Sequence, residues 1–307
     1  MDGLLNQLID YCRPFTQEGN VASYIPALAK ADPSGLGVFI LDHNGLSSHG
    51  GDSQTRFTIQ SIIKPILLLL ALMDNGEEYV RSRVGVESTG KPFDAINISN
   101  AVNQEILSEH INPMVNMGAI VMCTLIRGKD YAERFSRILE LTRHLANNPD
   151  IDVDEEVYRS EKITGNKNRA LAFMMKSCAM LDGDVEEVLD CYFRACSIRV
   201  DCRDLARIAF IFSNKGKDFS GNQYFPPRYA HYVNAVLMTC GMYDGAGDFA
   251  VTVGVPAKSG VGGGIMAVVP GRMGIGIFSP SLDKKGNSIA GIQILRLLSQ
   301  RLQLSIF

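Results

Sequence analysis

The stretch FTIQSIIKP, residues 57–65, places Ser61 and Lys64 three positions apart, directly before the apolar run ILLLLALM of residues 66–73. Residues i and i+3 of a helix share a face, so the lysine can reach the serine. A helix start also offers unpaired backbone N–H groups and the positive end of the helix dipole. Because the following turns are apolar on every side, we expect a buried helix, and burial would favour the neutral amine of Lys64.

Taken alone, this Ser-x-x-Lys pattern is weak evidence for a nucleophile and its base. Two further matches, at 88–91 and 281–284, fall in a Gly/Pro-containing loop and in a polar turn. Roughly one match is expected by chance in a chain of this length. The segment alone favours a structural role, in which Ser61 caps the helix and Lys64 reaches solvent, so a second motif is needed.

The second motif is Lys258-Ser259-Gly260, within AKSGVGGG at 257–264. Serine acyl enzymes that use a Ser-x-x-Lys nucleophile also carry a K-[ST]-G strand on the opposite wall of the site. The glycines lack Cβ atoms, so we expect a substrate to lie against the strand edge there. The backbone N–H of Val261 would then point at a developing oxyanion. A Gly-rich hairpin bend is the alternative interpretation, and the third motif of these enzymes, S-D-N, is absent.

Both ends of the chain have β character, and the middle is helical. A helix at 4–12 precedes a strand at 35–42, and Asn44-Gly45 is a hairpin signal. After residue 246, β-rich runs alternate with Gly and Pro before a closing helix at 288–302. Between these parts, apolar residues recur at helical spacing in five segments, at 66–74, 115–127, 131–146, 168–181 and 186–196.

The simplest arrangement pairs the two ends into one sheet and inserts the helices as a second lobe. We therefore predict an α+β fold, an α/β sandwich of the β-lactamase/transpeptidase type, with an antiparallel sheet flanked by helices. The whole chain, 1–307, would form one domain. Its α/β lobe would comprise residues 1–65 and 205–307, and its helical lobe residues 66–204.

Composition narrows the classes of function. A formal net charge of −3 gives no electrostatic reason to expect nucleic acid or a membrane surface as partner. The longest apolar run, 66–73, is far shorter than the roughly 20 residues of a membrane span. The five histidines show no zinc-site spacing, so no metal is expected. Seven cysteines without a CxxC pair, and a start without signal-peptide features, predict a cytoplasmic protein with reduced thiols.

Ordered strings along most of the chain are similar to those of the serine-dependent glutaminases, which share the β-lactamase-like fold. These strings are YIPALAK (24–30), FTIQSIIKP (57–65), NPMVNMGAI (112–120), SEKITGNKN (160–168), YFRACSI (192–198), CGMYDGAG (240–247), GVPAKSGVGGG (254–264) and GNSIAGI (286–292). The resemblance implies hydrolysis of L-glutamine to L-glutamate and ammonia without a cofactor. It also implies a homo-oligomer, dimer or tetramer, whose only other partner is the small-molecule substrate.

The resemblance also implies catalytic roles. Ser61 would be the nucleophile and Lys64 its base. Tyr192 and Tyr243 would sit around this pair, with Tyr243 the better candidate to relay a proton to the leaving ammonia. The backbone N–H groups of Ser61 and Val261 would form the oxyanion hole.

Nine residues would recognise the substrate by the same resemblance: Tyr24, Gln60, Ser61, Asn116, Glu161, Asn168, Tyr192, Tyr243 and Val261. The assignment makes chemical sense, because Glu161 supplies the negative charge that the α-ammonium of glutamine needs. Asn116 and Asn168 can donate to its carboxylate. The loop 85–97 resembles a mobile gate of the family beside the active site, and we expect it to be flexible in the free enzyme.

Two residues depart from the family pattern, and two alternative functions remain open at this point. Ile63 and Met117 stand where the family commonly has small or polar residues, which could alter packing behind the nucleophile. A β-lactamase or penicillin-binding hydrolase would share the fold, but the missing S-D-N and the missing export signal oppose it. A non-catalytic amino-acid-binding protein is opposed by the intact Ser61–Lys64 pair with Tyr243.

Overall fold

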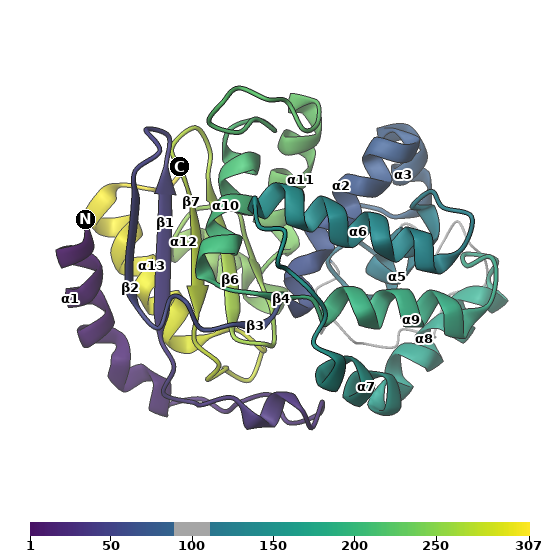
Figure 1. The fold of residues 1–307 in the computed structure, drawn as a ribbon, viewed down its shortest axis with the longest axis horizontal. Helices are drawn as coiled ribbons and strands as arrows, with labels where there is room; N and C mark the ends of the chain where they lie inside the picture. Colours follow the sequence, from purple (N-terminus) through teal and green to yellow (C-terminus); the bar gives the residue numbers. More distant parts are fainter. Residues whose placement is uncertain (89–110) are drawn as a thin grey trace.

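The computed structural model describes residues 1–88 and 111–307, and its centre is an antiparallel sheet of five strands in the order β2-β1-β7-β6-β5 (Figure 1). The first two strands and the last three come from opposite ends of the chain. They meet where β1 pairs with β7, from Gly37 opposite Phe278 onwards. The predicted pairing of the two ends is therefore confirmed. The strands are β1 (Gly37–Asp42), β2 (Ser47–Gly51), β5 (Ala257–Ser259), β6 (Gly264–Val269) and β7 (Met273–Phe278).

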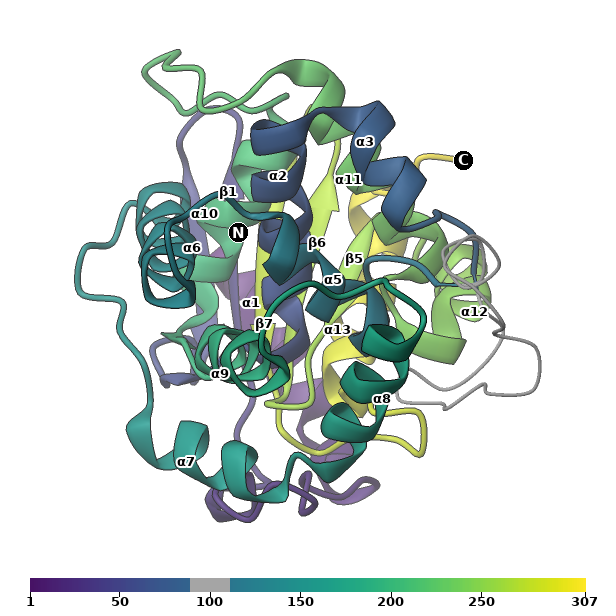
Figure 2. The ribbon, with the colours of Figure 1, turned by 90° about the vertical axis from the view of Figure 1, so that its right-hand side faces the viewer.

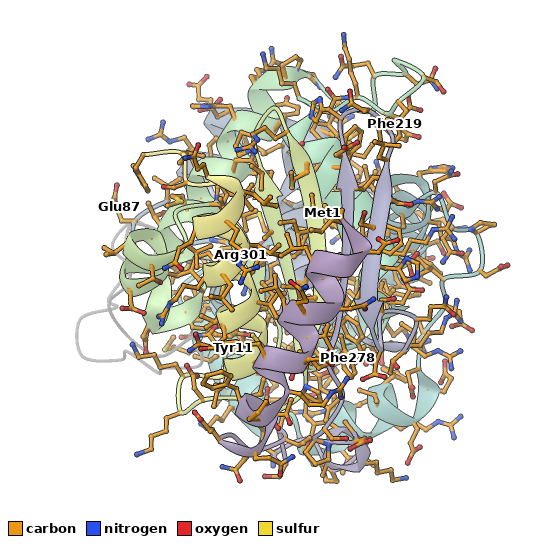
Figure 3. The ribbon with its side chains drawn as sticks, turned by 90° about the vertical axis from the view of Figure 1, so that its left-hand side faces the viewer. Met1, Tyr11, Glu87, Phe219, Phe278 and Arg301 are labelled. Carbon is orange, nitrogen blue, oxygen red and sulfur yellow. The ribbon has the colours of Figure 1, made fainter. Side chains whose placement is uncertain are left out.

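One face of the sheet, which we call the outer face, is covered by helices from both chain ends. These are α1 (Asp2–Cys12), α12 (Ala246–Thr252) and α13 (Ile289–Leu302). Figure 3 shows α1 and α13 side by side over the strands, with Tyr11 on α1 and Arg301 on α13. Their apolar faces and the outward side chains of the sheet form one buried cluster, which fits the helical periodicity of both terminal segments.

The inner face of the sheet packs against α10 (Cys202–Ser213), with α11 (Pro227–Cys240) beside it. Two glycines of β7 make the close approach of α10 possible. A Cβ at Gly274 would lie 2.1 Å from the carbonyl oxygen of Ala206, and one at Gly276 would lie 2.0 Å from that of Cys202. The alternating Gly-Ile pattern of β7 thus provides a smooth surface for the helix.

The other half of the molecule is helical, and Figure 2 shows α7, α8 and α9 on its surface. The five predicted helices are present, but α3, α7, α10 and α11 were not predicted as separate helices, and α12 lies where the sequence analysis expected β-rich runs. α7 begins within the segment interpreted as a loop, 147–158, where the Asp154 carboxylate accepts hydrogen bonds from the backbone N–H groups of Glu156 and Val157. The helices of this half are α2 (Lys64–Asn75), α3 (Glu77–Arg83), α5 (Asn116–Leu125), α6 (Tyr131–Ala146), α7 (Glu155–Thr164), α8 (Asn166–Ser177) and α9 (Val185–Cys196).

Helix α2 runs through the middle of this half, and every residue from Lys64 to Leu72 is buried. Its leucines join the largest apolar cluster, to which α5, α6, α9, α10 and α11 also contribute. The expectation of a buried helix after Ser61 is confirmed. In the part of the chain that the structure describes, no helix is long and apolar enough to cross a membrane.

A two-stranded sheet fixes the segment that leads into α2. β3 (Phe57–Thr58) pairs with β4 (Arg199–Val200), which directly follows α9. The backbone N–H of Ile59 then donates to the carbonyl oxygen of Ile198 at 2.7 Å. The chain turns through the 3₁₀ helix η3 (Gln60–Ile63) into α2. The start of α2 is thereby held beside the end of α9.

Candidate active site

Ser61 lies in η3, at a cavity of about 490 Å³ between the two halves of the molecule. Its neighbour Gln60 has a φ of +48°, a left-handed conformation that is costly for a residue with a side chain. Most of the site residues expected from the sequence line this cavity, namely Tyr24, Gln60, Ser61, Asn116, Glu161, Asn168 and Tyr192. The structure therefore brings together side chains from five separate parts of the chain.

Lys64 lies behind Ser61 and is 0% exposed. Its Nζ donates to the backbone oxygen of Met114 at 3.1 Å and to Oδ1 of Asn116 at 2.7 Å. A neutral amine has two hydrogens and one lone pair. In the neutral form, the lone pair is the part of the amine that can accept a proton.

Asn116, at the start of α5, connects the base to the cavity wall. Its Oδ1 accepts from Lys64 and from the phenol of Tyr192 at 3.3 Å, and its Nδ2 donates to Oδ1 of Asn168 at 2.9 Å. The two lone pairs of the amide oxygen are thus both used. These bonds fix the orientation of the amide.

Tyr243 and Val261 lie beside the cavity rather than among its lining residues, and they share a small apolar cluster with Ile25. Burial raises the pKa of Tyr243 well above its usual range, and the hydrogen bond with Ser61 opposes this rise. The phenol therefore stays protonated at neutral pH and can act as a proton donor next to the serine. Like Gln60, Tyr243 has a left-handed backbone, with φ at +51°.

Lys258 is a site residue that the sequence analysis did not assign. It is 0% exposed, and its Nζ donates to the carbonyl oxygens of Gly241 at 3.0 Å and Ser259 at 2.7 Å. Its nitrogen also lies 4.3 Å from the centre of the Tyr243 ring. Burial lowers the pKa of Lys258 well below its usual range, and the nearby charge of Lys64 lowers it further. The K-S-G motif itself was the signal that could have identified it.

The glycines after Lys258 allow a close approach between two segments of backbone. A Cβ at Gly260 would lie 2.8 Å from the carbonyl oxygen of Ile59, and one at Gly262 would lie 2.4 Å from that of Thr58. The space beside these two glycines is therefore filled by the segment before Ser61. These glycines let the turn after Lys258 pack against Thr58 and Ile59, and the expectation that substrate lies against the strand there stays a prediction.

Glu161, on α7, is the acidic group of the cavity and is 6% exposed. Burial raises its pKa from an ordinary value of 4.5 to about 8, although a hydrogen bond with Gln60 and the charge of Lys64 lower it. Its Oε2 is buried and has no hydrogen-bond partner among the described residues. A ligand with a positive charge and N–H donors would satisfy this oxygen.

The mouth of the cavity is marked by Tyr24, which is 57% exposed. Lysines at positions 167, 284 and 285 also line it. Lys284 belongs to the Ser-x-x-Lys match at 281–284, which the sequence analysis treated as a turn. The other lining residues were not assigned to the site, although all of them except Lys285 lie within the glutaminase-like strings. They are Ile25, Thr164, Gly165, Asn166, Lys167, Cys196, Asp244 and Lys285.

The two departures from the family pattern face the core. Ile63 is 0% exposed and Met117 is 6% exposed, and both belong to the largest apolar cluster. They therefore contribute packing behind Ser61 and Asn116 rather than lining the cavity. Within the described residues, no group of three or more His, Cys, Asp or Glu side chains could hold a metal ion.

Comparison with known sequences identifies the family. The model of the family described as Glutaminase matches residues 19–307. The chain belongs to the glutaminase family. A glutaminase of Clostridium tetani is 51% identical over 308 residues, and one of Clostridium botulinum is 50% identical over 310 residues; each alignment covers 100% of both chains. The family is one of hydrolases that act on glutamine, which decides against the β-lactam-directed and non-catalytic alternatives.

Solved structures agree with this assignment. A probable glutaminase from Bacillus subtilis, complexed with 6-diazo-5-oxo-L-norleucine, has a TM-score of 0.90 and 38% identity, covering 99% of this chain and 95% of the other. A Bacillus subtilis glutaminase in a covalent complex with 5-oxo-L-norleucine has a TM-score of 0.90 and 36% identity, covering 100% and 99%. The fold is thus the α+β, serine β-lactamase-like fold of the glutaminases, as the sequence predicted.

Proposed function

We propose that this glutaminase hydrolyses L-glutamine to L-glutamate and ammonia through a γ-glutamyl ester on Ser61. The observation that carries the proposal is the burial of Lys64 at the start of α2, three residues after Ser61, where its Nζ donates to Met114 and Asn116. That arrangement suits a neutral amine whose lone pair takes the serine proton. The covalent complex of the Bacillus subtilis glutaminase supports a nucleophilic mechanism in this fold.

The first half of the reaction forms the ester. The Ser61 oxygen attacks the side-chain amide carbon of glutamine, and its proton passes to Lys64. The negative charge that develops on the amide oxygen is stabilised by the backbone N–H groups of Ser61 and Val261. The C–N bond then breaks, and ammonia leaves after it receives a proton through Tyr243 or Lys64.

The second half returns the enzyme to its starting state. Water loses a proton to Lys64 and attacks the ester carbon, again with the oxyanion held by the same two N–H groups. The bond to the Ser61 oxygen breaks, and the serine takes a proton back. L-Glutamate is released, and no cofactor or metal takes part in any of these steps.

Recognition of glutamine uses the charge distribution of the cavity. Glu161 binds the α-ammonium, which satisfies its buried Oε2 and favours its ionised form. Asn168 and Asn116 donate to the α-carboxylate, while Tyr24, Gln60 and Tyr192 complete the walls. The roles match the residue types, because each charged end of the substrate meets groups of complementary character.

Three further proposals concern the whole chain. The resemblance to the glutaminases supports a homo-oligomer, dimer or tetramer, which light scattering coupled to size-exclusion chromatography tests. The chain acts as one domain, with an α/β lobe of 1–65 plus 205–307 and a helical lobe of 66–204, and it works in the cytoplasm. The gate predicted at 85–97 lies, from residue 89 onward, outside the described residues.

An assay of ammonia release from glutamine tests the function, with Ser61→Ala and Lys64→Ala as variants. We expect the native protein to release ammonia and both variants to be inactive. A native protein that is inactive on glutamine but is acylated by a β-lactam would contradict the proposed substrate. Full activity in Ser61→Ala would contradict the mechanism while leaving the substrate intact.

A further inference from the structure

A cluster of four polar side chains joins α7 to α9 beside the cavity. Asp190 of α9 accepts hydrogen bonds from the phenol of Tyr158 and from Nζ of Lys162, both on α7. It also accepts from Nε of Arg194, one turn further along α9, at 2.9 Å. We call Tyr158, Lys162, Asp190 and Arg194 the α7–α9 cluster. Asp190 is its centre, because it is the acceptor for the other three.

The remaining contacts of the α7–α9 cluster reinforce the same geometry. Arg194 donates to the Tyr158 phenol oxygen at 3.3 Å, and Lys162 donates to it at 3.2 Å. The Arg194 guanidinium carbon also lies 4.3 Å from the centre of the Tyr158 ring, a cation–π contact. Burial raises the pKa of Asp190, but the hydrogen bonds from Lys162, Tyr158 and Arg194 outweigh it and leave the pKa below its ordinary value. Asp190 is therefore ionised at neutral pH.

Both helices joined by this cluster carry residues of the proposed substrate site. Glu161 directly precedes Lys162 on α7, and Tyr192 lies two residues after Asp190 on α9. Two residues along a helix correspond to a rotation of about 200°. Tyr192 therefore faces the cavity from the side of α9 opposite to Asp190. The cluster does not line the cavity, and any effect on the substrate passes through the positions of the two helices.

The position of α7 matters because this helix carries Glu161 to the cavity wall. Its Oε2 has no hydrogen-bond partner among the described residues, and its carboxyl group has a hydrogen bond with Gln60, so its orientation depends on where α7 lies relative to η3. A carboxylate and an ammonium in a buried site interact strongly only at close range. A small displacement of α7 relative to α9 would thus weaken binding of the ammonium.

We infer that the α7–α9 cluster, through Asp190, positions Glu161 against Tyr192 and so sets the affinity for the α-ammonium of glutamine. This inference rests on the proposed role of Glu161. Ser61 and Lys64 belong to η3 and α2, and the link from Lys64 to Tyr192 runs through Asn116 of α5, whereas Glu161 is carried by α7 itself. The cluster therefore affects substrate binding more than the chemical step, and its members are positioning residues.

The test compares Asp190→Asn and Tyr158→Phe with the matched control Asp74→Asn. Asp74 accepts two hydrogen bonds from Arg137, at 2.6 and 2.8 Å, and joins α2 to α6 with the same chemistry away from the cavity. We expect Asp190→Asn to raise KM for glutamine about tenfold, equivalent to about 1.4 kcal/mol, with kcat within about twofold of the native value. Tyr158→Phe removes the bond from the phenol to Asp190 and the two that the phenol accepts from Lys162 and Arg194, but it leaves the ion pairs of Asp190 in place, so it should raise KM about threefold. Asp74→Asn should lower Tm without changing KM.

The possible outcomes distinguish a positioning role of the α7–α9 cluster from a purely structural one. If Asp190→Asn lowers Tm as Asp74→Asn does but leaves KM unchanged, the positioning role is wrong and the cluster is only structural. If Asp190→Asn fails to fold, Tyr158→Phe decides, and an unchanged KM in that variant overturns the inference. Glu161→Gln distinguishes a failure of the proposed ammonium site from a failure of the inference about the α7–α9 cluster. An unchanged KM in Glu161→Gln contradicts the proposed ammonium site, whereas a raised KM there with normal values in both cluster variants contradicts the inference alone.

Discussion

Nζ of Lys64 lies 2.7 Å from Oδ1 of Asn116, and this contact joins the proposed base to the wall that would hold the substrate. The same amide oxygen accepts from Tyr192, and the amide nitrogen donates to Asn168. Loss of any one of these bonds leaves a polar group buried without its partner, which costs more than the bond itself contributes. Base, amide and phenol are therefore expected to act as a unit.

Replacing Lys64 by methionine tests the base without opening a cavity. The side chain keeps its length and apolar stem but loses the amine, so the buried site stays filled. We expect kcat/KM for glutamine to fall by about three orders of magnitude or more, the range for loss of a general base. Tm should fall slightly, because the carbonyl oxygen of Met114 and Oδ1 of Asn116 each lose a donor. Retention of more than about a tenth of native activity would show that another group takes the serine proton.

Tyr243→Phe tests proton delivery to the leaving group. Because the pKa of Tyr243 is raised, its phenol is protonated throughout the neutral range and can donate to nitrogen. We expect kcat for glutamine to fall about a hundredfold. The γ-methyl ester of glutamate has a leaving group that needs less protonation, so its hydrolysis should fall much less. An equal loss on both substrates would assign Tyr243 to a step that the amide and the ester share.

Glu161→Gln should stabilise the fold at alkaline pH. The folded carboxyl group titrates at about 8 instead of an ordinary 4.5, so between these values the folded state holds a proton that the unfolded state releases. Stability of the native protein therefore falls as pH rises through this window and is constant above it. The glutamine side chain does not titrate, so we expect the variant to have the higher Tm at pH 8.5 and a much smaller advantage at pH 5. Equal Tm values at pH 8.5 would contradict the burial of an ionised Glu161.

Gly262→Ala tests the packing of the K-S-G turn against the segment before the serine. The added Cβ would lie 2.4 Å from the carbonyl oxygen of Thr58, so the turn must move away from η3. We expect a loss of about 1–3 kcal/mol in the free energy of unfolding and a lower kcat. Gly3→Ala is the control, since its Cβ meets nothing within 4 Å and it lies in α1. Native kcat in Gly262→Ala would show that this approach is not needed for catalysis.

A helix could be predicted from the sequence where a local pattern of apolar residues fixes it, and was missed where contacts distant in the sequence hold it. The helices at 64–75 and 185–196 were predictable, because their apolar spacing records a local pattern of burial. Helix α7 was missed, because its residues are mostly polar and it is held by Asp154 at its start and by the cluster with α9. Contacts between positions such as 158 and 190 leave no signal in the spacing of one sequence.

The candidate site, too, could be predicted from the sequence only in part. The resemblance to the glutaminases named the residues that meet at the cavity, but it did not indicate how they are bonded. The link from Lys64 to Asn116 spans 52 positions, and the support of Tyr243 by Lys258 spans 15. The glycines of the K-S-G turn show the limit most clearly, because a missing Cβ indicates that something comes close but not what it is. The structure identifies it as Thr58 and Ile59.

The central claim, that Ser61 is the nucleophile, is tested most directly by covalent trapping. The protein is treated with 6-diazo-5-oxo-L-norleucine, digested, and mapped by tandem mass spectrometry, with Ser61→Ala and an excess of glutamine as controls. We predict one modification per chain, located on Ser61, absent from Ser61→Ala and suppressed by glutamine. A modification on any other residue of the native protein, or undiminished labelling of Ser61→Ala, would contradict the account.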